Sequence, residues 1–467
     1  MLKSNIAWMK KNVPSDLKVW KGMIQDIDWS QVAAKTKLSL QRDKDRITAE
    51  FKEFAAMDTN AKIDWLMNGD RHLGYLYKKD AIAFARREWK GLKSVGYDFV
   101  GWLKIWGGML NMVMKDPMSI MLAVFEYHWF ASYLATPAVV DSSVFGRRGK
   151  MLQADFDMWV AITHWAEDLI ANLIMADAKI GGNQKINKRI IMFDEMTMAQ
   201  MMAGFPNLLG IPYQMIPVFM VSEMDQLTLI PYIDAIESYG LPSDTCPLPT
   251  AECGCAVKDE YPMCGQGFIA SSMPCDGSVM ASSYFARRFP EIPVHHLCFP
   301  VRYEDELTLD AAVEDVKACI RFIEKQTGEK WNWDAYFTAM KRFNTETDYE
   351  LQKWEINKTA YPQLIGPTYE LFRKWCYEMD GGLDPRTIKS CEKVNKILLK
   401  GYKNKEQAWR NKMRYRAITW SCPPHYYANF SNWLANCWGI NILVEMESLN
   451  FTKPLETEDK EEALRDL

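Results

Sequence analysis

Two cysteines stand where a thiolate could act as a metal ligand or a nucleophile. Cys246 lies directly before a predicted helix, in Asp244-Thr245-Cys246-Pro247, and Cys275 lies between a predicted strand and a predicted helix. The positive end of a helix stabilises a thiolate, and ligands of a parallel sheet gather beyond the carboxyl ends of its strands. Two thiolates on adjoining strand-end loops would suit an iron–sulfur cluster, which prefers soft sulfur ligands.

The other cysteines mostly favour structural roles. The chain has 11 cysteines, and none of them precedes Cys246. Five are set among apolar or helical neighbours and are predicted to be buried small hydrophobes: Cys298, Cys319, Cys376, Cys391 and Cys437. Cys253-Gly254-Cys255 leaves a metal site or a redox dithiol open beside a structural role, although no Cys-x-x-Cys pair supports a zinc ribbon.

The segments around these cysteines alternate in the manner of an α/β protein with a parallel sheet. The predicted strands are 216–221, 267–271, 294–299, 415–420 and 440–444. The predicted helices are 196–203, 232–239, 279–288 and 427–437, with two long amphipathic helices carrying the apolar positions of 309–323 and 336–354. A helix is also expected at 155–178, and the acidic tail 456–466 is expected to be a solvated helix.

The predicted fold is therefore α/β, in four parts. A helical N-terminal region (1–190) precedes an α/β parallel-sheet lobe with the cluster cysteines (191–305), a helical insertion (306–410) and the start of a second α/β lobe (411–467). Gly181-Gly182-Asn183 is a candidate hinge between the first two parts.

Charge and hydropathy limit the partners and the compartment. The net charge is −4, from 56 basic and 60 acidic residues, which argues against a broad nucleic-acid surface. The apolar segment 119–140 holds Glu126 and His128 and favours a buried helix pair, with a membrane contact as the alternative. No export signal opens the chain and the cysteine count is odd, so we expect a cytoplasmic protein.

The order of several motifs resembles the first lobe of the activator-dependent 2-hydroxyacyl-CoA dehydratases, a superfamily that includes the benzoyl-CoA reductases. Leu-Pro-x-Asp-x-Cys-Pro occupies 241–247, and a strand leads into Cys275-Asp276-Gly277. A further strand, 293–300, ends at a proline, and 415–447 is similar to the start of the second lobe. Before these motifs, 195–204 and Ile211-Pro212 resemble the family's glycine-terminated helix and following proline.

The resemblance implies an iron–sulfur subunit of a lyase that eliminates water from a 2-hydroxyacyl-CoA through a ketyl radical. Cys246 and Cys275 match the first two of the family's three ligands to a [4Fe–4S] cluster. The implied partners are a second dehydratase subunit in a heterodimer, an ATP-dependent iron–sulfur activator and the acyl-CoA substrate. The chain has no GxGxxG or GxxxxGK[ST] motif, so the nucleotide chemistry is assigned to a partner.

Two departures from the family pattern leave alternatives open. The second lobe is expected to be incomplete, and Cys422 matches a loop other than that of the third ligand. The third ligand, the acyl group and the role of the N-terminal region stay open. The alternatives are a benzoyl-CoA reductase-type subunit and a non-catalytic truncated paralogue. His295 and His296 are expected to point to opposite faces of a strand, one of them into the core.

Overall fold

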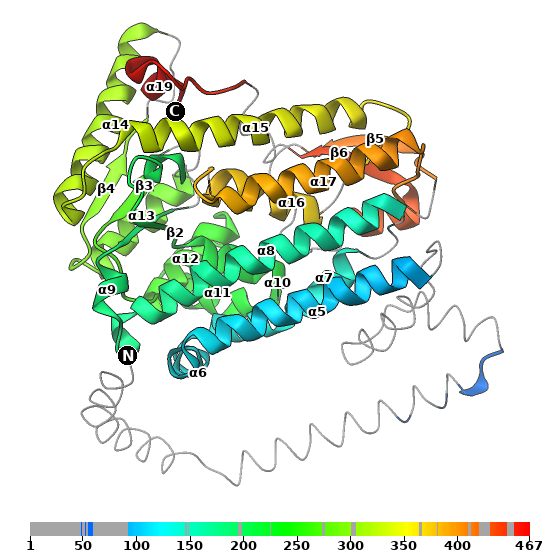
Figure 1. The fold of residues 1–467 in the computed structure, drawn as a ribbon. Coiled ribbons are helices and arrows are strands. Elements are labelled where there is room, and N and C mark those ends of the chain that lie inside the picture. The colour runs from blue at the N-terminus through cyan, green and yellow to red at the C-terminus, as the bar shows by residue number, and fades with distance from the viewer. Residues whose placement is uncertain are drawn as a thin grey trace. The chain divides into compact units, whose positions relative to one another are not determined.

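The chain divides into two compact units, Met1–Arg86 and Arg87–Leu467, and the second contains all the helices and strands discussed below. The computed structural model describes residues 48, 52, 55–58, 92–144, 147, 149–194, 199–224, 226–272, 276–299, 305–363, 367–380, 382–409, 412–419, 430–445 and 453–467. Figure 1 shows the described elements from one side, with their labels.

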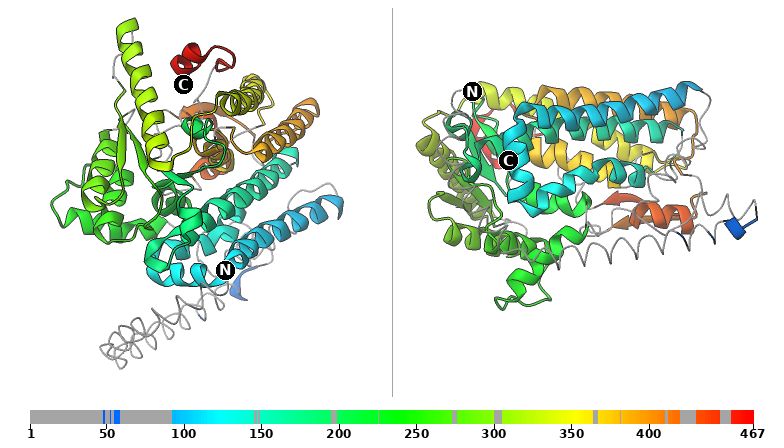
Figure 2. Two further views of the ribbon diagram at one scale, coloured as in Figure 1. Left: turned by 60° about the vertical axis from the view of Figure 1, so that its left-hand side comes forward. Right: turned by 90° about the horizontal axis from the view of Figure 1, so that it is seen from below.

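Helices make up the first described part of the second unit, as the sequence predicted. They are α5 (Leu92–Lys115), α6 (Pro117–Glu126), a 3-10 helix (His128–Ala135), α7 (Thr136–Ser143) and α8 (Gly149–Ala176). Asp116 caps α6 and Pro117 takes a first-turn position, where its missing N–H has no cost. The long helices α5 and α8 lie side by side (Figures 1 and 2). The segment 119–140 is helical as predicted, but α6 buries only Ile120 and Ala123.

The turn between α8 and the sheet is tightly capped. Gly181 has a φ of 93°, a left-handed conformation that glycine adopts without strain, and it closes a 3-10 helix, Ala178–Ile180. Asn183 then caps the short helix α9 (Gln184–Asn187). The predicted hinge residues therefore connect two ordered elements through capping hydrogen bonds.

A four-stranded parallel sheet follows, in the order β2-β1-β3-β4. Its strands are β1 (Ile190–Phe193), β2 (Leu209–Pro212), β3 (Phe268–Ser271) and β4 (Val294–Leu297). Successive side chains of a strand point to opposite faces, so Met192 and Phe268 join one core cluster while Phe193 and Ile269 join another. Helix α13 (Asp276–Arg288) covers the first face and α14 (Glu306–Thr327) covers the second.

Strands β3 and β4 were predicted from sequence, but the strand expected at 216–221 was wrong. That segment forms a π-helix, Met215–Phe219, which continues into α10 (Met220–Met224). Every residue of the π-helix is buried, so a short apolar run without alternation could not distinguish a strand from a buried helix. The strands of this region are β1 and β2, and none of the predicted strands covers them.

Helices dominate the next part. The elements are α11 (Ile230–Glu237), α12 (Pro247–Val257), α15 (Trp333–Asn357), α16 (Pro367–Arg373), a π-helix (Lys374–Asp380) and α17 (Pro385–Lys403). Helices α14 and α15 confirm the two predicted amphipathic helices, and α14 ends at Gly328, whose φ is 79°.

The last described part is a two-stranded parallel sheet. It consists of β5 (Tyr415–Thr419) and β6 (Ile440–Glu445), with α18 (Phe430–Trp433) and a π-helix (Leu434–Trp438) between them. Gly439 follows the π-helix with a φ of 68°, as expected for a helix end. The tail forms α19 (Lys460–Asp466), but it is not merely solvated, because Ala463 and Leu464 are buried and the helix packs on α14.

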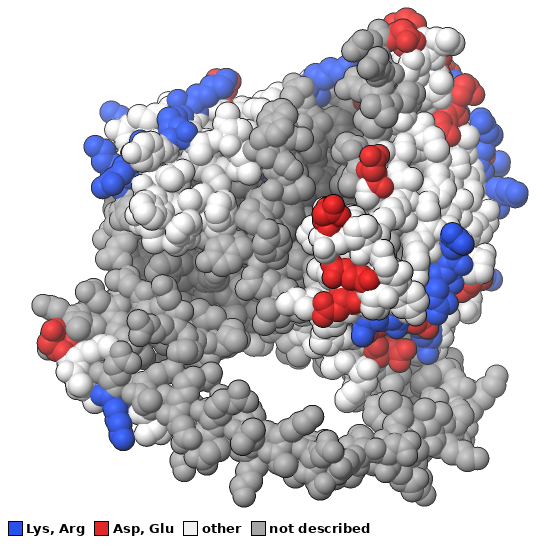
Figure 3. All heavy atoms as spheres, turned by 180° about the vertical axis from the view of Figure 1, so that it is seen from behind, with Lys and Arg blue, Asp and Glu red and all other residues white. Residues whose placement is uncertain are grey.

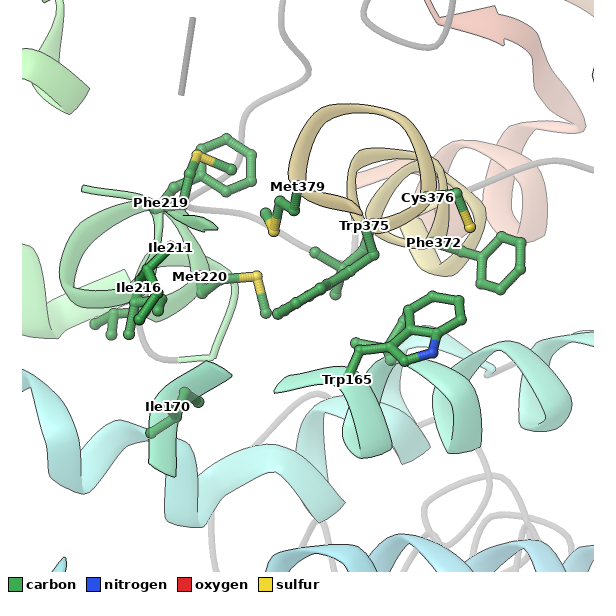
Figure 4. Close-up of a cluster of buried hydrophobic side chains, with 14 of the residues drawn as sticks. Trp165, Ile170, Ile211, Ile216, Phe219, Met220, Phe372, Trp375, Cys376 and Met379 are labelled. Atoms are coloured by element: carbon green, nitrogen blue, oxygen red, sulfur yellow. The ribbon is translucent and has the colours of Figure 1, made fainter. Parts of the chain in front are cut away.

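The architecture is thus mixed α/β, with N-terminal helices, a four-stranded parallel sheet, a helical stretch and a small two-stranded parallel sheet. The first three of these parts meet in one buried cluster (Figure 4), where Trp165 of α8 lies 5.6 Å from Phe372 of α16 between ring centroids. Met220 of α10 and Trp375 of the second π-helix join the same cluster. The boundaries at 190, 305 and 410 stay predictions.

The surface carries charges of both signs, and the described helices are not of the membrane-spanning kind. On the face seen in Figure 3, acidic and basic side chains both occur, and in places they lie next to each other. Among the residues that the structure describes, none of the helices combines the length and the apolar character needed to cross a bilayer.

Candidate functional site

Three parallel strands end at one edge of the larger sheet. Strand β1 ends at Phe193, β3 at Ser271 and β4 at Leu297. Asp194, which follows β1, is fully buried, and its carboxylate accepts a hydrogen bond from the Ser271 N–H at 2.9 Å. The Ser272 N–H in turn donates to the Leu297 carbonyl oxygen at 2.9 Å. This edge is the place where ligands bind in open parallel sheets.

Cys246 occupies the position expected for a reactive thiol. It is the N-cap residue of α12, it is exposed, and Pro247 takes the first helical position. Its carbonyl oxygen accepts hydrogen bonds from the Thr250 N–H and hydroxyl, at 3.2 and 2.8 Å, which fix the first turn of the helix. The helix N-terminus favours a negatively charged sulfur here.

Cys275 lies outside the described residues, but both of its flanks are described. Strand β3 ends at Ser271, and α13 begins at Asp276, directly after Cys275. The strand-to-helix connection predicted from sequence is therefore confirmed at both ends. The first turn of α13 carries Asp276, and Ser278 is buried.

Helices α12 and α13 pack side by side, and the contacts near their starts and ends indicate that they run in the same direction. Cys253 and Ala281 share one small buried cluster. Beyond the C-terminal end of α12, the Tyr261 ring lies 5.7 Å from that of Phe285 on α13 and 6.4 Å from that of Phe289, which directly follows α13, measured between centroids. Tyr261 and Phe289 have the same sequence offset as Cys253 and Ala281. That offset sets the first turns of the two helices level with each other.

Cys253 and Cys255 are structural rather than metal-binding. Both are buried in α12, and residues two apart on a helix do not face the same way. Burial raises the pKa of Cys253 to about 11 and that of Cys255 well above its usual value, so both thiols stay protonated at neutral pH. Gly254 between them has a packing role, since a Cβ there would lie 1.9 Å from the Tyr232 carbonyl oxygen of α11.

Of the five cysteines that were predicted to be buried, three are buried and two are exposed. Cys319, Cys376 and Cys391 are buried as expected, and the last two have sulfur atoms 3.6 Å apart. Cys298 and Cys437 are exposed, so their predicted burial was wrong. Cys298 sits just beyond β4, where the strand has left the core, and Cys437 lies on the outer side of a π-helix. Cys422 lies outside the described residues.

No group of three His, Cys, Asp or Glu side chains suited to a metal ion occurs within the described ranges, which omit Cys275 and Cys422. Asp194 was missed by sequence reasoning. Its signal is an acidic residue directly after the apolar run Ile190–Phe193, which is typical of a strand end facing a site.

The two histidines of β4 are half-buried, so neither is a true core residue. The His295 ring stacks on Phe322 at 5.4 Å, and its Nε2 lies 3.9 Å from an Asp315 carboxylate oxygen. Desolvation lowers the pKa of both His295 and His296, which favours the neutral rings at pH 7.

Two helices beside the parallel sheet each begin directly after a cysteine. This arrangement is typical of α/β proteins that hold a ligand or metal at the carboxyl ends of their strands. The family model of the 2-hydroxyglutaryl-CoA dehydratase D-component matches residues 226–467, about half of the chain. The chain therefore belongs to the 2-hydroxyglutaryl-CoA dehydratase D-component family, which confirms the resemblance seen in its motifs. A comparison with curated proteins gives no match.

Some of the motifs that carried the resemblance lie inside the matched range, and others lie before it. It includes the segments around Cys246, Cys275 and Cys422, both long helices and the two-stranded sheet. Strands β1 and β2 and the N-terminal helices lie before it. Family membership indicates a dehydratase subunit, in a family typically associated with iron–sulfur chemistry.

Proposed function

We propose that this chain is the iron–sulfur subunit of a 2-hydroxyacyl-CoA dehydratase, in which Cys246 and Cys275 supply two thiolate ligands of a [4Fe–4S] cluster. The observation that carries the proposal is the parallel packing of α12 and α13, whose first turns directly follow these two cysteines. Family membership supports the same chemistry.

The residues present fit such a cluster. Cys246 is an exposed thiol at a helix N-terminus, and sulfur is the donor that iron–sulfur clusters require. When bound, the cluster would supply the one-electron chemistry of a ketyl radical path, which overcomes the weak acidity of a β-proton in an acyl thioester. Residues of this chain would position the two ligands. Asp194 links the end of β1 to the end of β3, which precedes Cys275, and Gly254 allows α12, which follows Cys246, to pack closely on α11.

The partners follow from the same proposal. A second dehydratase subunit would complete the heterodimer, and an ATP-dependent iron–sulfur activator would deliver the electron, because this chain has no phosphate-binding motif. The substrate would be an acyl-CoA, and the compartment the cytoplasm. Within the chain, 191–305 and 411–467 would form parts of two α/β lobes joined by the helices of 306–410.

Iron analysis tests the ligand assignment. The full chain, purified without oxygen together with its partner subunit, is expected to contain iron and acid-labile sulfide. Cys246→Ser and Cys275→Ser should each lower the iron content several-fold. Cys437→Ser is the matched control, because Cys437 is also exposed but does not precede a helix, and it should retain iron. Equal iron in all four proteins would refute the assignment, and no iron in the native complex would refute the enzymatic proposal.

Activity then tests the reaction. With activator, ATP, a low-potential reductant and a 2-hydroxyacyl-CoA, the complex should release water and form the unsaturated acyl-CoA. Reduction of an aromatic acyl-CoA without dehydration would indicate the reductase-type alternative. Iron content without either activity would indicate a non-catalytic relay.

A further inference from the structure

Helix α5 has two apolar faces, and the described part of the chain covers only one of them. The inner face packs on α8 through Ile105 and two glycines, where a Cβ on Gly101 would lie 3.4 Å from Phe156 and one on Gly108 would lie 2.9 Å from Thr163. A helix that is hydrophobic all round is normally buried on all sides. The outer face of α5 therefore needs a partner.

The outer face is formed by side chains that recur at helical spacing. They are 49 to 64 % exposed: Phe99, Val100, Leu103, Trp106, Leu110 and Met114. Helix α6 adds four more exposed apolar side chains: Met118, Met121, Val124 and Phe125. We call the six α5 residues the outer face of α5.

The exposed apolar area is large enough for a stable dimer. The ten side chains together leave uncovered on the order of 1,000 Å², taking roughly 200 Å² for a fully exposed large side chain. A standard interface buries about 800 Å² on each partner, and a monomer rarely exposes a patch larger than a few hundred Å². The apolar surface is therefore of the size that a second copy of the chain would bury in a dimer, and the outer face of α5 supplies about two thirds of it.

The outer face has nearly the same spacing when the helix is read in either direction. Phe99, Leu103 and Trp106 lead to the middle of the outer face of α5 in steps of four and then three residues. From the neighbouring Gly107, Leu110 and Met114 follow in steps of three and then four. A two-fold axis at this midpoint would set like surfaces against each other, which an isologous dimer requires.

The middle of the outer face contains a gap that fits the proposed axis. No atom lies within 4 Å of the place where a Cβ of Gly107 would be, whereas its neighbour Gly108 is packed on α8. Trp106 stands beside this gap and is 49 % exposed. A glycine in a helix face allows a second helix to approach closely, and the gap can receive the indole ring of a second copy.

We propose that α5 pairs antiparallel with α5 of a second copy of this chain, with Leu103 facing Leu110 and Trp106 seated over Gly107 across a two-fold axis. This surface lies before the range matched by the family model and is independent of the proposed dehydratase function. In the assembled enzyme it would join two copies of this subunit.

Light scattering after size-exclusion chromatography tests the pairing on the full chain. At micromolar concentration the native chain should have twice its 54.1 kDa mass, and Leu103→Glu/Leu110→Glu should have the monomer mass. Leu307→Glu is the control, because Leu307 is 80 % exposed but lies on α14, and it should stay dimeric. Circular dichroism should show all three proteins folded, since none of the substituted side chains is buried.

A monomeric native chain would overturn the proposal and would mean that another segment of the chain, a lipid surface or a different protein covers the outer face. An unchanged dimer in the double glutamate variant would also overturn it, because the dimer would then use another surface.

Disulfide cross-linking tests the antiparallel arrangement separately. Leu103→Cys/Leu110→Cys should form cross-linked dimers on mild oxidation, because position 103 faces position 110 of the second copy. Each single variant should not exceed the native background, because the two copies of position 103 would be about 10 Å apart along the axis. Cross-linking of the single variants at the level of the double variant would indicate a parallel pair and overturn the arrangement.

Discussion

The buried carboxylate of Asp194 holds the end of β3 through the Ser271 N–H, at a distance of 2.9 Å. Asp194 directly follows β1, so the hydrogen bond ties the carboxyl ends of two neighbouring strands. Ser271 is the last residue of β3 and shortly precedes Cys275. The contact therefore fixes the strand end from which the chain continues toward the predicted ligand.

Replacing this carboxylate should weaken both the fold and the site. Asp194→Ala is expected to lower the free energy of unfolding by about 1–3 kcal/mol, because the Ser271 N–H would lose its buried acceptor. The iron retained after anaerobic purification should fall with it. Asp194→Asn keeps an acceptor oxygen and is the matched variant, expected to lose less in both measurements. Full iron retention by Asp194→Ala would show that the strand end is held by other contacts.

The contact between Gly254 and α11 predicts a second effect on the site. Gly254→Ala would place a Cβ 1.9 Å from the Tyr232 carbonyl oxygen, so α12 would have to move away from α11. The expected cost is about 1–3 kcal/mol in urea unfolding, as for other overpacked interiors. Iron content should also drop, since α12 begins directly after Cys246. Ser283→Ala, on the exposed side of α13, should change neither value, and equal behaviour of the two variants would contradict the packing role.

The sequence predicted those elements whose ends carry a local signal. Asp305 and Asn332 cap α14 and α15, Gly328 ends α14, and the apolar positions of both helices recur at helical spacing. Strands β3 and β4 were found because glycine or proline stands just before each of them.

Tertiary packing decided the elements that were predicted wrongly. The buried run of 215–219 lacks any polar position that would mark a period, and only contact with Trp375 and the rest of the cluster in Figure 4 selects a helix. The position of Cys246 before a helix was predicted from Pro247, and the structure confirms it. The contacts of Asp194 and Gly254 could not be predicted, because their partners are distant in the sequence.

A buried carboxylate at the end of α8 predicts a pH dependence of stability. Asp177 accepts hydrogen bonds from the Tyr127 hydroxyl and from the Met263 and Lys179 N–H groups. Burial raises the pKa of Asp177 from 3.8 to about 6, despite these hydrogen bonds. The folded state therefore holds this proton more tightly than the unfolded state, and its contribution to stability is full below pH ~4 and lost as the pH rises through about 6.

Asp177→Asn removes this titration and tests its sign. Relative to the native chain, the variant should gain on the order of 1–3 kcal/mol in the free energy of unfolding between pH 4 and pH 8. Urea unfolding at several pH values within this range gives the difference. Asp234→Asn, at an exposed position of α11, should follow the native curve throughout. A difference that shrinks as the pH rises would contradict the raised pKa.

The ion pair between Arg147 and Asp155 is fully buried, and Arg147 also contacts Trp409, which is distant in the sequence. The Arg147 Nε lies 3.0 Å from an Asp155 carboxylate oxygen, and the guanidinium carbon lies 4.3 Å from the centroid of the Trp409 ring. Asp155 belongs to α8, while Trp409 follows α17 and forms an isolated antiparallel bridge with Arg147. Arg147 therefore joins the N-terminal helices, through Asp155, to the end of the helical stretch, through Trp409.

A single and a double variant test whether the charge pair contributes to stability. Arg147→Met should cost about 3–5 kcal/mol in urea unfolding, because it leaves the Asp155 carboxylate buried without its charge partner. Arg147→Met/Asp155→Leu should recover most of that loss, since two apolar side chains of similar volume tolerate burial. Lys393→Met breaks a pair with Asp157 in which the lysine is 54 % exposed, so it should cost less than about 1 kcal/mol. A double variant no more stable than Arg147→Met would mean that Trp409 stacking, rather than the charge pair, holds these segments together.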